Sequence, residues 1–326
     1  MQADLALIGF GNVGRRFVEL LEERAARLAG KHDLSCRVVA SSTRRGGAVY
    51  EGERCADSFE VIRRLGASRA DLRIVVETTT LDINAGEPAT SHVRAAIAAG
   101  CHVVTANKGP AAFAYAELRD AAARAGVSFL FESAVMDGIP IFNLVRETLP
   151  AVDIIGFEGV VNTTTNTIIT ALESGERFED ALARMQAEGI AEADASLDVD
   201  GWDAAAKTAA LANVLMDARI TPHDVVRRGL DATTGEAARA AVERGMRLKL
   251  VASAVRGWDG RLVCTVEPRA LPADHLLATL AGPANGLILH TDILDRIAIC
   301  QMGGSLTQTA YGLLSDIVTI ARGARP

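Results

Sequence analysis

The sequence predicts an α/β protein in which a doubly wound parallel sheet is followed by a second domain of mixed α+β structure. Two observations lead to this fold class. As far as Glu132, short apolar runs alternate with helical patterns, which is typical of a parallel sheet covered by helices on both faces. Beyond Glu132 the order changes to helices followed by alternating strands. A chain of 326 residues is long enough for two domains of roughly 100–200 residues each.

Five strands are predicted in the first domain. None of them alternates polar with apolar residues, so each is expected to be buried on both faces. Between the strands, apolar residues recur at helical spacing, as Val13, Phe17 and Leu20 do after the first one. The predicted strands are residues 4–8, 36–41, 72–77, 101–106 and 127–132, and the predicted helices follow Gly9 and then lie near 57–65, 88–99 and 111–125.

The second domain is expected to begin in a turn-rich joint, residues 133–140, which contains Gly138 and Pro140. We therefore divide the chain into a dinucleotide-binding domain, 1–135, and a substrate domain, 136–302, with a last helix near 303–326 packing back on the first. In the second domain the predicted helices are 163–174, 177–188 and 203–216, and the predicted strands are 153–161, 246–255, 261–268, 285–291 and 296–302.

The turn after the first strand reads GFGNVG, a GxGxxG pattern. Here it follows a strand, opens a helix and begins a run of βα units, which is the context of a dinucleotide-binding, Rossmann-type turn. The first glycine permits the tight turn, the second lets backbone N–H groups approach a pyrophosphate, and the third allows close helix packing. The alternative is that the glycines serve only the turn itself. The predicted cofactor contacts are Gly9, Phe10, Gly11, Asn12, Val13 and Gly14.

The end of the second strand indicates which nucleotide is bound. An NAD site usually carries Asp or Glu there for the ribose 2′-hydroxyl, whereas this chain has SSTRRGG at residues 41–47. Arg44 or Arg45 can bind a 2′-phosphate in bidentate fashion. NADP is therefore favoured, with NAD still possible. The alternative is that both arginines are solvated loop charges.

Composition and charge exclude several classes of function. The net charge is −7 and basic residues occur only in short pairs, so no nucleic-acid partner is expected. No apolar run reaches the roughly 18 residues of a membrane span, and the N-terminus shows no cleavage signal. The five cysteines are scattered and the six histidines show no zinc-ligand spacing. We expect a cytoplasmic protein without a membrane partner.

An acidic stretch, AEADASLDVDGWDAAAK at residues 191–207, invites a metal interpretation. Ser196, Asp198 and Asp200 fall where an EF-hand loop places its first, third and fifth residues. The twelfth position of such a loop requires a bidentate Glu, and here it is Lys207. The acidic spacing is therefore interpreted as a coincidence, and the lysine as the residue to explain.

The helical pattern that begins at Trp202 places Asp203 and Lys207 one turn apart on one face. Alanines surround the lysine, so this helix is expected to be buried. A buried lysine needs a carboxylate partner and its pKa becomes tunable, which suits a proton donor to a developing alkoxide. The alternative is an ordinary surface ion pair.

A second lysine, Lys108 in TANKGP, follows the predicted strand 101–106. It is expected to project from the carboxyl end of that strand, which is the edge of the sheet where ligands bind in this fold class. The alternative is a solvated lysine on a Gly-Pro turn.

Taken together, these segments resemble the homoserine dehydrogenase family. The resemblance runs from residue 5 to about 216 and continues more weakly to the C-terminus; the length is similar to that of the short form without a regulatory domain. It implies reversible hydride transfer between NADP(H) and aspartate semialdehyde or homoserine. The matching segments are LIGFGNVG, ETTTLDINAGEPATSHVRAAIAAGCHVVTANKGP, FESAVMDGIP, GVVNTTTNTII and, most specifically, GIAEADASLDVDGWDAAAK.

The resemblance implies a role for individual residues. Lys207 is the expected proton donor to the aldehyde oxygen, and Lys108 contacts cofactor and substrate. Glu192 and Asp203 are expected to hold the substrate's ammonium, with Asp198 in support. The resemblance also implies a homodimer formed through the second domain. Further expected contacts are Thr79 and Gly303 for the cofactor, and the main-chain oxygens of Glu132, Val135, Asp137 and Ile139 for a structural sodium ion.

Three segments depart from the family's pattern and leave the substrate open. Asp137 stands where the family has a small residue, Thr163 replaces a glycine, and residues 301–305 replace a glycine-rich turn. Two alternatives therefore remain. One is a diverged enzyme acting on another small hydroxy or amino acid, and the other is an NADP(H) sensor without turnover.

Overall fold

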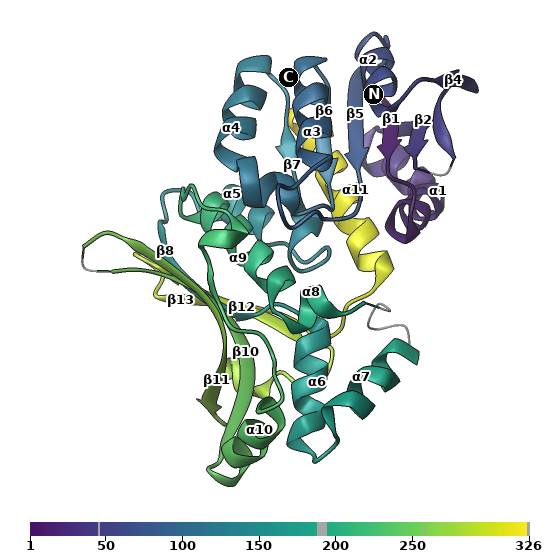
Figure 1. Cartoon of the computed structure of the whole chain (residues 1–326). Helices are drawn as coiled ribbons and strands as arrows, with labels where there is room; N and C mark the ends of the chain where they lie inside the picture. Colours follow the sequence, from purple (N-terminus) through teal and green to yellow (C-terminus); the bar gives the residue numbers. More distant parts are fainter. Residues whose placement is uncertain (45, 188–193, 258, 325–326) are drawn as a thin grey trace. The chain divides into compact units, whose positions relative to one another are not determined.

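The computed structural model describes residues 1–324 apart from 45, 188–193 and 258. The chain divides into two compact units, Met1–Arg146 with Ser305–Pro326 and Glu147–Gly304 (Figure 1). Each unit is built on one sheet of its own. Among the described residues, no helix is both long and apolar enough to cross a membrane.

The first unit contains a seven-stranded sheet in the order β4-β3-β2-β1-β5-β6-β7. Its parallel strands confirm the predicted fold class. They are β1 (Gln2–Ile8), β2 (Ser35–Thr43), β5 (Leu72–Glu77), β6 (His102–Thr105) and β7 (Phe129–Leu130). The prediction missed β3 (Gly47–Tyr50) and β4 (Glu53–Cys55), which extend the sheet as an antiparallel edge. Both are too short to show a periodic pattern in the sequence.

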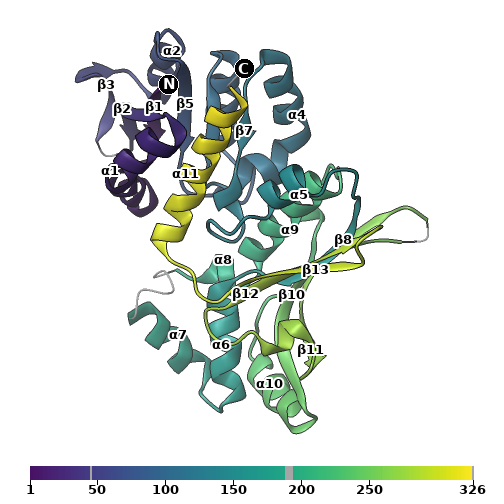
Figure 2. The ribbon, with the colours of Figure 1, turned by 180° about the vertical axis from the view of Figure 1, so that it is seen from behind.

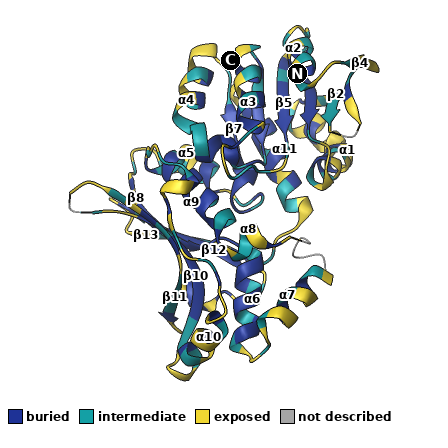
Figure 3. Ribbon diagram, in the orientation of Figure 1, coloured by how far each residue is buried: buried dark blue, intermediate teal, exposed yellow. Residues whose placement is uncertain are grey.

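Helices cover the two faces of this sheet. On one face α1 (Asn12–His32) and α11 (Leu306–Gly323) lie side by side (Figure 2). Phe17, Leu313 and Ile317 pack there with Leu5 and Leu7 of β1, since alternate residues of a strand point to one face. The other face carries α2 (Ser58–Gly66), α3 (Ala89–Ala98) and α4 (Gly109–Ala125). The central strands are accordingly buried (Figure 3).

The second unit contains a six-stranded sheet in the order β13-β12-β8-β10-β11-β9, in which most neighbours are antiparallel. Its strands are β8 (Ile154–Val160), β9 (Val226–Arg227), β10 (Met246–Arg256), β11 (Leu262–Pro272), β12 (Asn285–Thr291) and β13 (Arg296–Gln301). Its helices include α6 (Thr163–Glu173), α7 (Phe178–Ala187), α8 (Ser196–Val199), α9 (Trp202–Leu215) and α10 (Thr234–Glu243). The prediction missed β9 and α10, together with α5 (Phe142–Thr148), which begins in the first unit.

Two buried carboxylates, Glu132 and Asp316, connect α11 with the segment that follows β7 within the first unit. The Glu132 side chain accepts the N–H groups of Ile141, Phe142 and Asn143 at 2.6–2.9 Å, and the Glu132 N–H donates to Asp316 Oδ2 at 2.9 Å. Asp316 also accepts from Asn143 Nδ2 at 3.3 Å. Burial raises the pKa of Asp316 to about 7 and raises the pKa of Glu132 above its ordinary value.

We expect the Asp316→Asn protein to gain stability relative to wild type as the pH rises from 3.8 to about 7, the ordinary and folded-state pKa values of Asp316. Within this window the folded protein holds a proton on Asp316 that the unfolded chain has released. The stabilising contribution of this group is fully present below the lower pKa and is lost as the pH passes the upper one. Thermal unfolding at a series of pH values measures the difference.

Asp82→Asn is the control: the Ala85 N–H lowers the pKa of Asp82, so the stabilising contribution of Asp82 is present above pH 3.8 and is lost only as the pH falls below it. Between pH 3.8 and about 7 this variant should therefore show no gain in stability relative to wild type. A stability difference between Asp316→Asn and wild type that does not change with pH contradicts the expectation.

Candidate active site

The turn between β1 and α1 holds the glycine motif; its packing requires glycine at Gly9 and leaves little room for a side chain at Gly14. Gly9 has φ of 91°, and its N–H donates to the Ser42 carbonyl at 2.9 Å. A Cβ at Gly9 would lie 2.7 Å from the main chain of Thr78, so any other residue would force the two strand ends apart. A Cβ at Gly14 would lie 3.2 Å from the Gly9 carbonyl oxygen.

The middle glycine differs because the space around it is open. A Cβ at Gly11 would meet no described atom within 4 Å, and Gly11 is the N-cap of α1. The first turn of α1 carries no acidic side chain, so its N–H groups and the helix dipole favour an anion. Phe10 and Asn12 are exposed and Val13 is half-buried. This cradle fits the pyrophosphate of a dinucleotide.

Arg44 lies directly after β2, at the tip of the β2–β3 hairpin, with an exposed side chain. Thr43 Oγ1 accepts the Gly46 N–H at 2.7 Å and shapes this turn. Residues 41–44 bring no carboxylate, and Glu51 is the first acid after them, in the turn between β3 and β4. An exposed guanidinium therefore lies at the strand end where this fold binds the ribose 2′ position.

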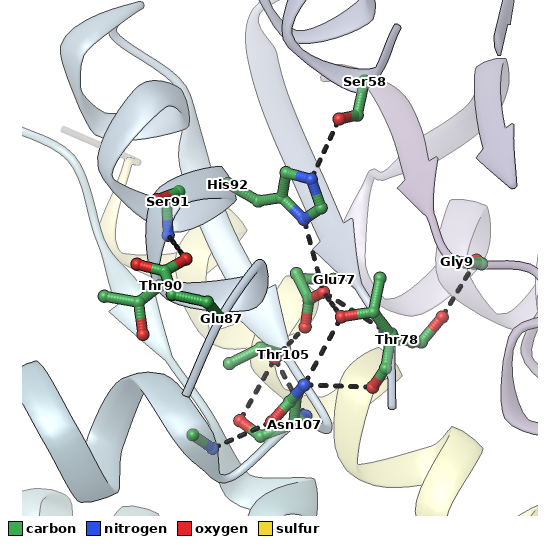
Figure 4. A network of polar contacts seen from close by, with 12 residues as sticks. Gly9, Ser58, Glu77, Thr78, Glu87, Thr90, Ser91, His92, Thr105 and Asn107 are labelled. Atoms are coloured by element: carbon green, nitrogen blue, oxygen red, sulfur yellow. Dashed lines mark hydrogen bonds and ion pairs between the residues drawn. The ribbon is translucent and has the colours of Figure 1, made fainter. Parts of the chain in front are cut away.

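Thr79 and Lys108 follow the neighbouring strands β5 and β6. Asn107 joins the two turns, since its Nδ2 donates to the Thr79 carbonyl at 3.0 Å and its Oδ1 accepts the Gly109 N–H at 2.8 Å. Lys108 is half-buried and is the N-cap of α4. Thr78 Oγ1 donates to the Gly9 carbonyl at 3.0 Å (Figure 4). These turns share the carboxyl edge of the sheet with the glycine motif.

Lys207 and Asp203 form the ion pair that the sequence predicted within a buried helix. Lys207 Nζ lies 2.9 Å from Asp203 Oδ2, and the two side chains are 14% and 15% exposed. Lys207 Nζ also donates to the Val161 carbonyl at 2.7 Å. The alanines at 204–206, 209 and 210 are at most 2% exposed, so the predicted burial of this helix is confirmed. The pair is therefore not an ordinary surface ion pair.

Asn162 was missed by the sequence prediction and lies between the acids of this cluster. Its Nδ2 donates to Asp198 Oδ1 at 2.7 Å and to Asp203 Oδ2 at 2.9 Å. Its Oδ1 caps α6 by accepting the Thr165 N–H at 2.8 Å. The segment NTTT does carry an N-cap signal, but nothing in the sequence indicates that the same amide bridges two carboxylates of a distant segment.

The surroundings of Asp198 raise the pKa of its carboxyl group. Burial raises its pKa, and the nearby charge of Asp203 raises it further. Hydrogen bonds from Asn162 and Thr164, together with the charge of Lys207, act in the opposite direction. A cation placed beside Asp198 would favour its charged form, so this cluster is suited to an ammonium group.

The acidic stretch does not form a calcium loop. Residues 196–199 form α8, and Gly201, with φ of 79°, begins α9. Among the described residues, no group of three or more His, Cys, Asp or Glu side chains could hold a metal ion. Glu192, the other predicted substrate contact, lies outside the described residues.

Two of the departures from the family pattern meet at one buried side chain. Asn285 Nδ2 donates to Thr163 Oγ1 at 2.8 Å and to Gln301 Oε1 at 3.4 Å. Thr163 and Gln301 therefore accept from the same amide nitrogen, although they are far apart in the sequence. Gly303, a predicted cofactor contact, is half-buried in the segment between β13 and α11.

The predicted sodium contacts belong to the segment that starts with the 3₁₀ helix Glu132–Ala134 and continues as irregular turns. Asp137 has φ of 49° there, and its Oδ1 accepts from Thr309 Oγ1 at 2.8 Å. Main-chain oxygens of such turns are hard donors of the kind that alkali and alkaline-earth ions accept. The donor set thus fits the ion that the resemblance implies, and its role would be structural.

Comparison with known proteins shows which family the chain belongs to. Residues 140–318 match the model of the homoserine dehydrogenase family, and residues 9–132 match the model of the homoserine dehydrogenase NAD-binding domain. An NAD(+)-dependent homoserine dehydrogenase of Pseudomonas canavaninivorans is 36% identical over 98% of this chain and 96% of that protein. A homoserine dehydrogenase of Methanocaldococcus jannaschii is 34% identical over 97% of this chain and 98% of that one.

Solved structures agree with the sequence matches. A homoserine dehydrogenase from Thiobacillus denitrificans superposes with a TM-score of 0.87 at 31% identity, covering 99% of this chain and 74% of that chain. A putative homoserine dehydrogenase from Archaeoglobus fulgidus gives 0.85 at 28% identity, covering 98% and 99%. The two family models, the relatives and these structures all describe one family, and this chain belongs to it: the homoserine dehydrogenases.

Proposed function

We propose that the chain is a homoserine dehydrogenase that transfers hydride reversibly between NADP(H) and aspartate semialdehyde or homoserine. The observation that carries the proposal is the ion pair of Lys207 with Asp203, 2.9 Å apart in a helix that is otherwise packed with buried alanines. A lysine that is only partly exposed and is held between a carboxylate and a main-chain carbonyl is placed to move a proton. A packing helix has no need of such a residue.

Lys207 acts on the oxygen of the substrate. In the direction of reduction it donates a proton as the aldehyde oxygen gains charge, and in the direction of oxidation it accepts the hydroxyl proton. Its contacts with Asp203 and the Val161 carbonyl fix the direction of Nζ. Because the Asp203 charge stabilises the ammonium form, this carboxylate helps Lys207 to recover its proton after each reduction.

The acids around Lys207 select the substrate. Asp203 and Asp198 present carboxyl groups that Asn162 holds together, and Glu192 is proposed to join them. The ammonium of an α-amino acid supplies the positive charge that this cluster favours. A hydroxy acid without an amino group would leave the acids uncompensated, which supports homoserine over a non-amino substrate.

The first unit supplies the nucleotide contacts, and the cofactor itself supplies the hydride. The glycine cradle and the α1 N-terminus would hold the pyrophosphate, with Thr79 and Lys108 proposed as further contacts; Gly303, also proposed as a contact, belongs to the second unit. A sodium ion at the main-chain oxygens of Glu132, Val135, Asp137 and Ile139 is proposed as a structural component alone.

Two other functions remain as rivals. A diverged enzyme is favoured by Thr163 and Gln301, which change the surroundings of Asn285 in the second unit. An NADP(H) sensor would bind nucleotide without turnover, and the buried proton donor argues against it. A panel of small hydroxy and amino acids assayed with both nucleotides distinguishes the three cases.

We expect Lys207→Met to lower kcat/KM for homoserine by about 10²–10⁴-fold, the usual contribution of a positioned general acid or base. Steady-state rates of NADPH formation measure the effect. Lys249→Met is the matched control, because Lys249 is another lysine of the second unit with little exposure, 1%, but donates to Asn166 and the Leu280 carbonyl.

The control should lose thermal stability while the folded protein keeps its kcat. Turnover by Lys207→Met at the wild-type rate, or no turnover of homoserine by the wild type, would sink the proposal.

The choice of NADP over NAD rests on Arg44, and the NAD(+)-dependent relative from Pseudomonas canavaninivorans points the other way. If NADP is the cofactor, Arg44→Ala should raise the KM for NADP by about 10- to 150-fold, since a bidentate phosphate contact contributes roughly 1.5–3 kcal/mol. The KM for NAD should stay unchanged. Arg69→Ala, an exposed arginine after α2, is the control. Equal effects on both nucleotides, or a wild type that prefers NAD, contradict the choice.

A homodimer through the sheet of the second unit is also proposed. Helices α6, α9 and α10 pack against this sheet. The opposite face exposes apolar and small residues on neighbouring strands: Val255 and Val263 are 57% and 50% exposed, and Ala298 and Cys300 are also exposed.

We expect Val255→Asp with Val263→Asp to convert the dimer to monomer in sedimentation velocity, because two charges per chain would be buried without partners. Ile293→Asp, in the turn between β12 and β13, is the control, with 66% of Ile293 exposed off the face. A wild type that sediments as a monomer at micromolar concentration rejects the dimer.

A further inference from the structure

We propose that Glu77 is a positioning residue of the active site, whose buried carboxylate holds the turns of Thr79 and Lys108 in the shape that the cofactor requires. The inference rests on the proposed function, because those two turns are proposed to contact the nucleotide. Glu77 itself touches neither cofactor nor substrate in this assignment; it acts through its hydrogen-bond partners.

Glu77 is the last residue of β5 and is 0% exposed. A carboxylate without solvent is costly unless hydrogen-bond donors replace the water. Its Oε1 accepts from the Thr79 N–H at 3.2 Å and from the Thr79 hydroxyl, and its Oε2 accepts from Thr105 Oγ1 at 3.1 Å. In Figure 4 Glu77 lies between His92 above and Thr105 and Asn107 below.

These contacts belong to a closed ring. Thr105 Oγ1, besides its bond to Glu77, accepts the Asn107 N–H at 2.9 Å. Asn107 Nδ2 donates to the Thr79 carbonyl at 3.0 Å. Because Thr79 is itself a partner of Glu77, this bond closes the ring. The Ala106 N–H also donates to the Glu77 carbonyl, at 3.1 Å. Lys108 follows Asn107 directly, so the ring fixes the backbone from which the lysine side chain departs.

His92 supplies the remaining neighbour of the carboxylate. Its Nδ1 lies 3.7 Å from Glu77 Oε1 and its Nε2 lies 2.9 Å from Ser58 Oγ. His92 is 5% exposed, and within the described residues its Nδ1 has no hydrogen-bond partner. When the Ser58 hydroxyl donates to Nε2, the proton of a neutral imidazole sits on Nδ1 and faces the carboxylate. The Glu77 carboxylate then faces the donors of Thr79 and Thr105 and the N–H dipole of His92.

A structural role alone would make Glu77 equivalent to other buried carboxylates of the same sheet, and Asp4 provides the comparison. Asp4 is 2% exposed and accepts from Arg37 Nε at 3.1 Å and from Ser68 Oγ at 2.6 Å. It lies on β1 toward the amino end, whereas Glu77 lies at the carboxyl end of β5. The two residues share burial, charge and satisfied hydrogen bonds, and they differ in which turns they hold.

The test compares Glu77→Gln with Asp4→Asn in the full-length protein. Gln keeps the volume but replaces one acceptor oxygen by a donor, so the hydroxyls of Thr79 and Thr105 can no longer both donate to this side chain, and the ring must rearrange. We expect the Kd of NADPH or NADH, measured by fluorescence titration, to rise about tenfold and kcat to fall about tenfold in Glu77→Gln, since small displacements of positioning groups cost this much or more. Asp4→Asn should lower the melting temperature without changing either quantity.

A Glu77→Gln protein whose Kd and kcat match those of Asp4→Asn overturns the inference. Thr105→Val serves if Glu77→Gln does not fold, because it keeps the carboxylate and the shape of a wholly buried residue but removes the hydroxyl that joins Glu77 to Asn107. An unchanged nucleotide Kd in Thr105→Val also overturns it. A wild type that binds nucleotide but does not oxidise homoserine rejects the proposed function instead, and the Kd comparison still decides the role of Glu77.

Discussion

The ion pair of Lys207 with Asp203 sets the requirement that the second unit satisfies. Two charges in a helix of buried alanines are stable only when each has a partner and further hydrogen bonds. The structure meets this need with the Val161 carbonyl and the Asn162 amide, which lie between β8 and α6. The same helix must also pack closely on its sheet, and alanine at the surrounding positions permits that. The sequence of α9 therefore accounts both for the acidic site and for the close packing of this helix.

The same arrangement occurs at strand ends in both units: one buried polar side chain makes hydrogen bonds to several groups of the neighbouring turns. Glu77 joins two turns after parallel strands, Glu132 accepts three N–H groups at the start of α5, and Asn162 caps α6 while it bridges two acids. Each of these side chains would destabilise the protein if it were unpartnered. Because each side chain makes hydrogen bonds to several groups, it fixes the conformation of a loop that otherwise has only local turn propensity.

The fold class was predictable because strands buried on both faces leave apolar runs in the sequence, and the strand–turn–helix context turned a weak glycine pattern into a specific one. The edge hairpin β3–β4 and the short β9 were missed, because their pairing depends on neighbours in space. Asn162 was missed for a similar reason. Its capping role is local and visible, but its bonds to Asp198 and Asp203 join segments that the sequence does not bring together.

The sequence by itself determined the order of the longer strands of both sheets, the need for glycine at the first turn, and the pairing of Asp203 with Lys207, since each depends on residues that are close together along the chain. Only the tertiary structure decided which distant groups share a hydrogen bond: Glu77 with Thr105, Glu132 with Asp316 through its main chain, and Asn285 with Thr163 and Gln301. Periodicity encodes burial and local spacing, whereas these contacts depend on strand register and helix packing, which emerge only when the whole unit has folded.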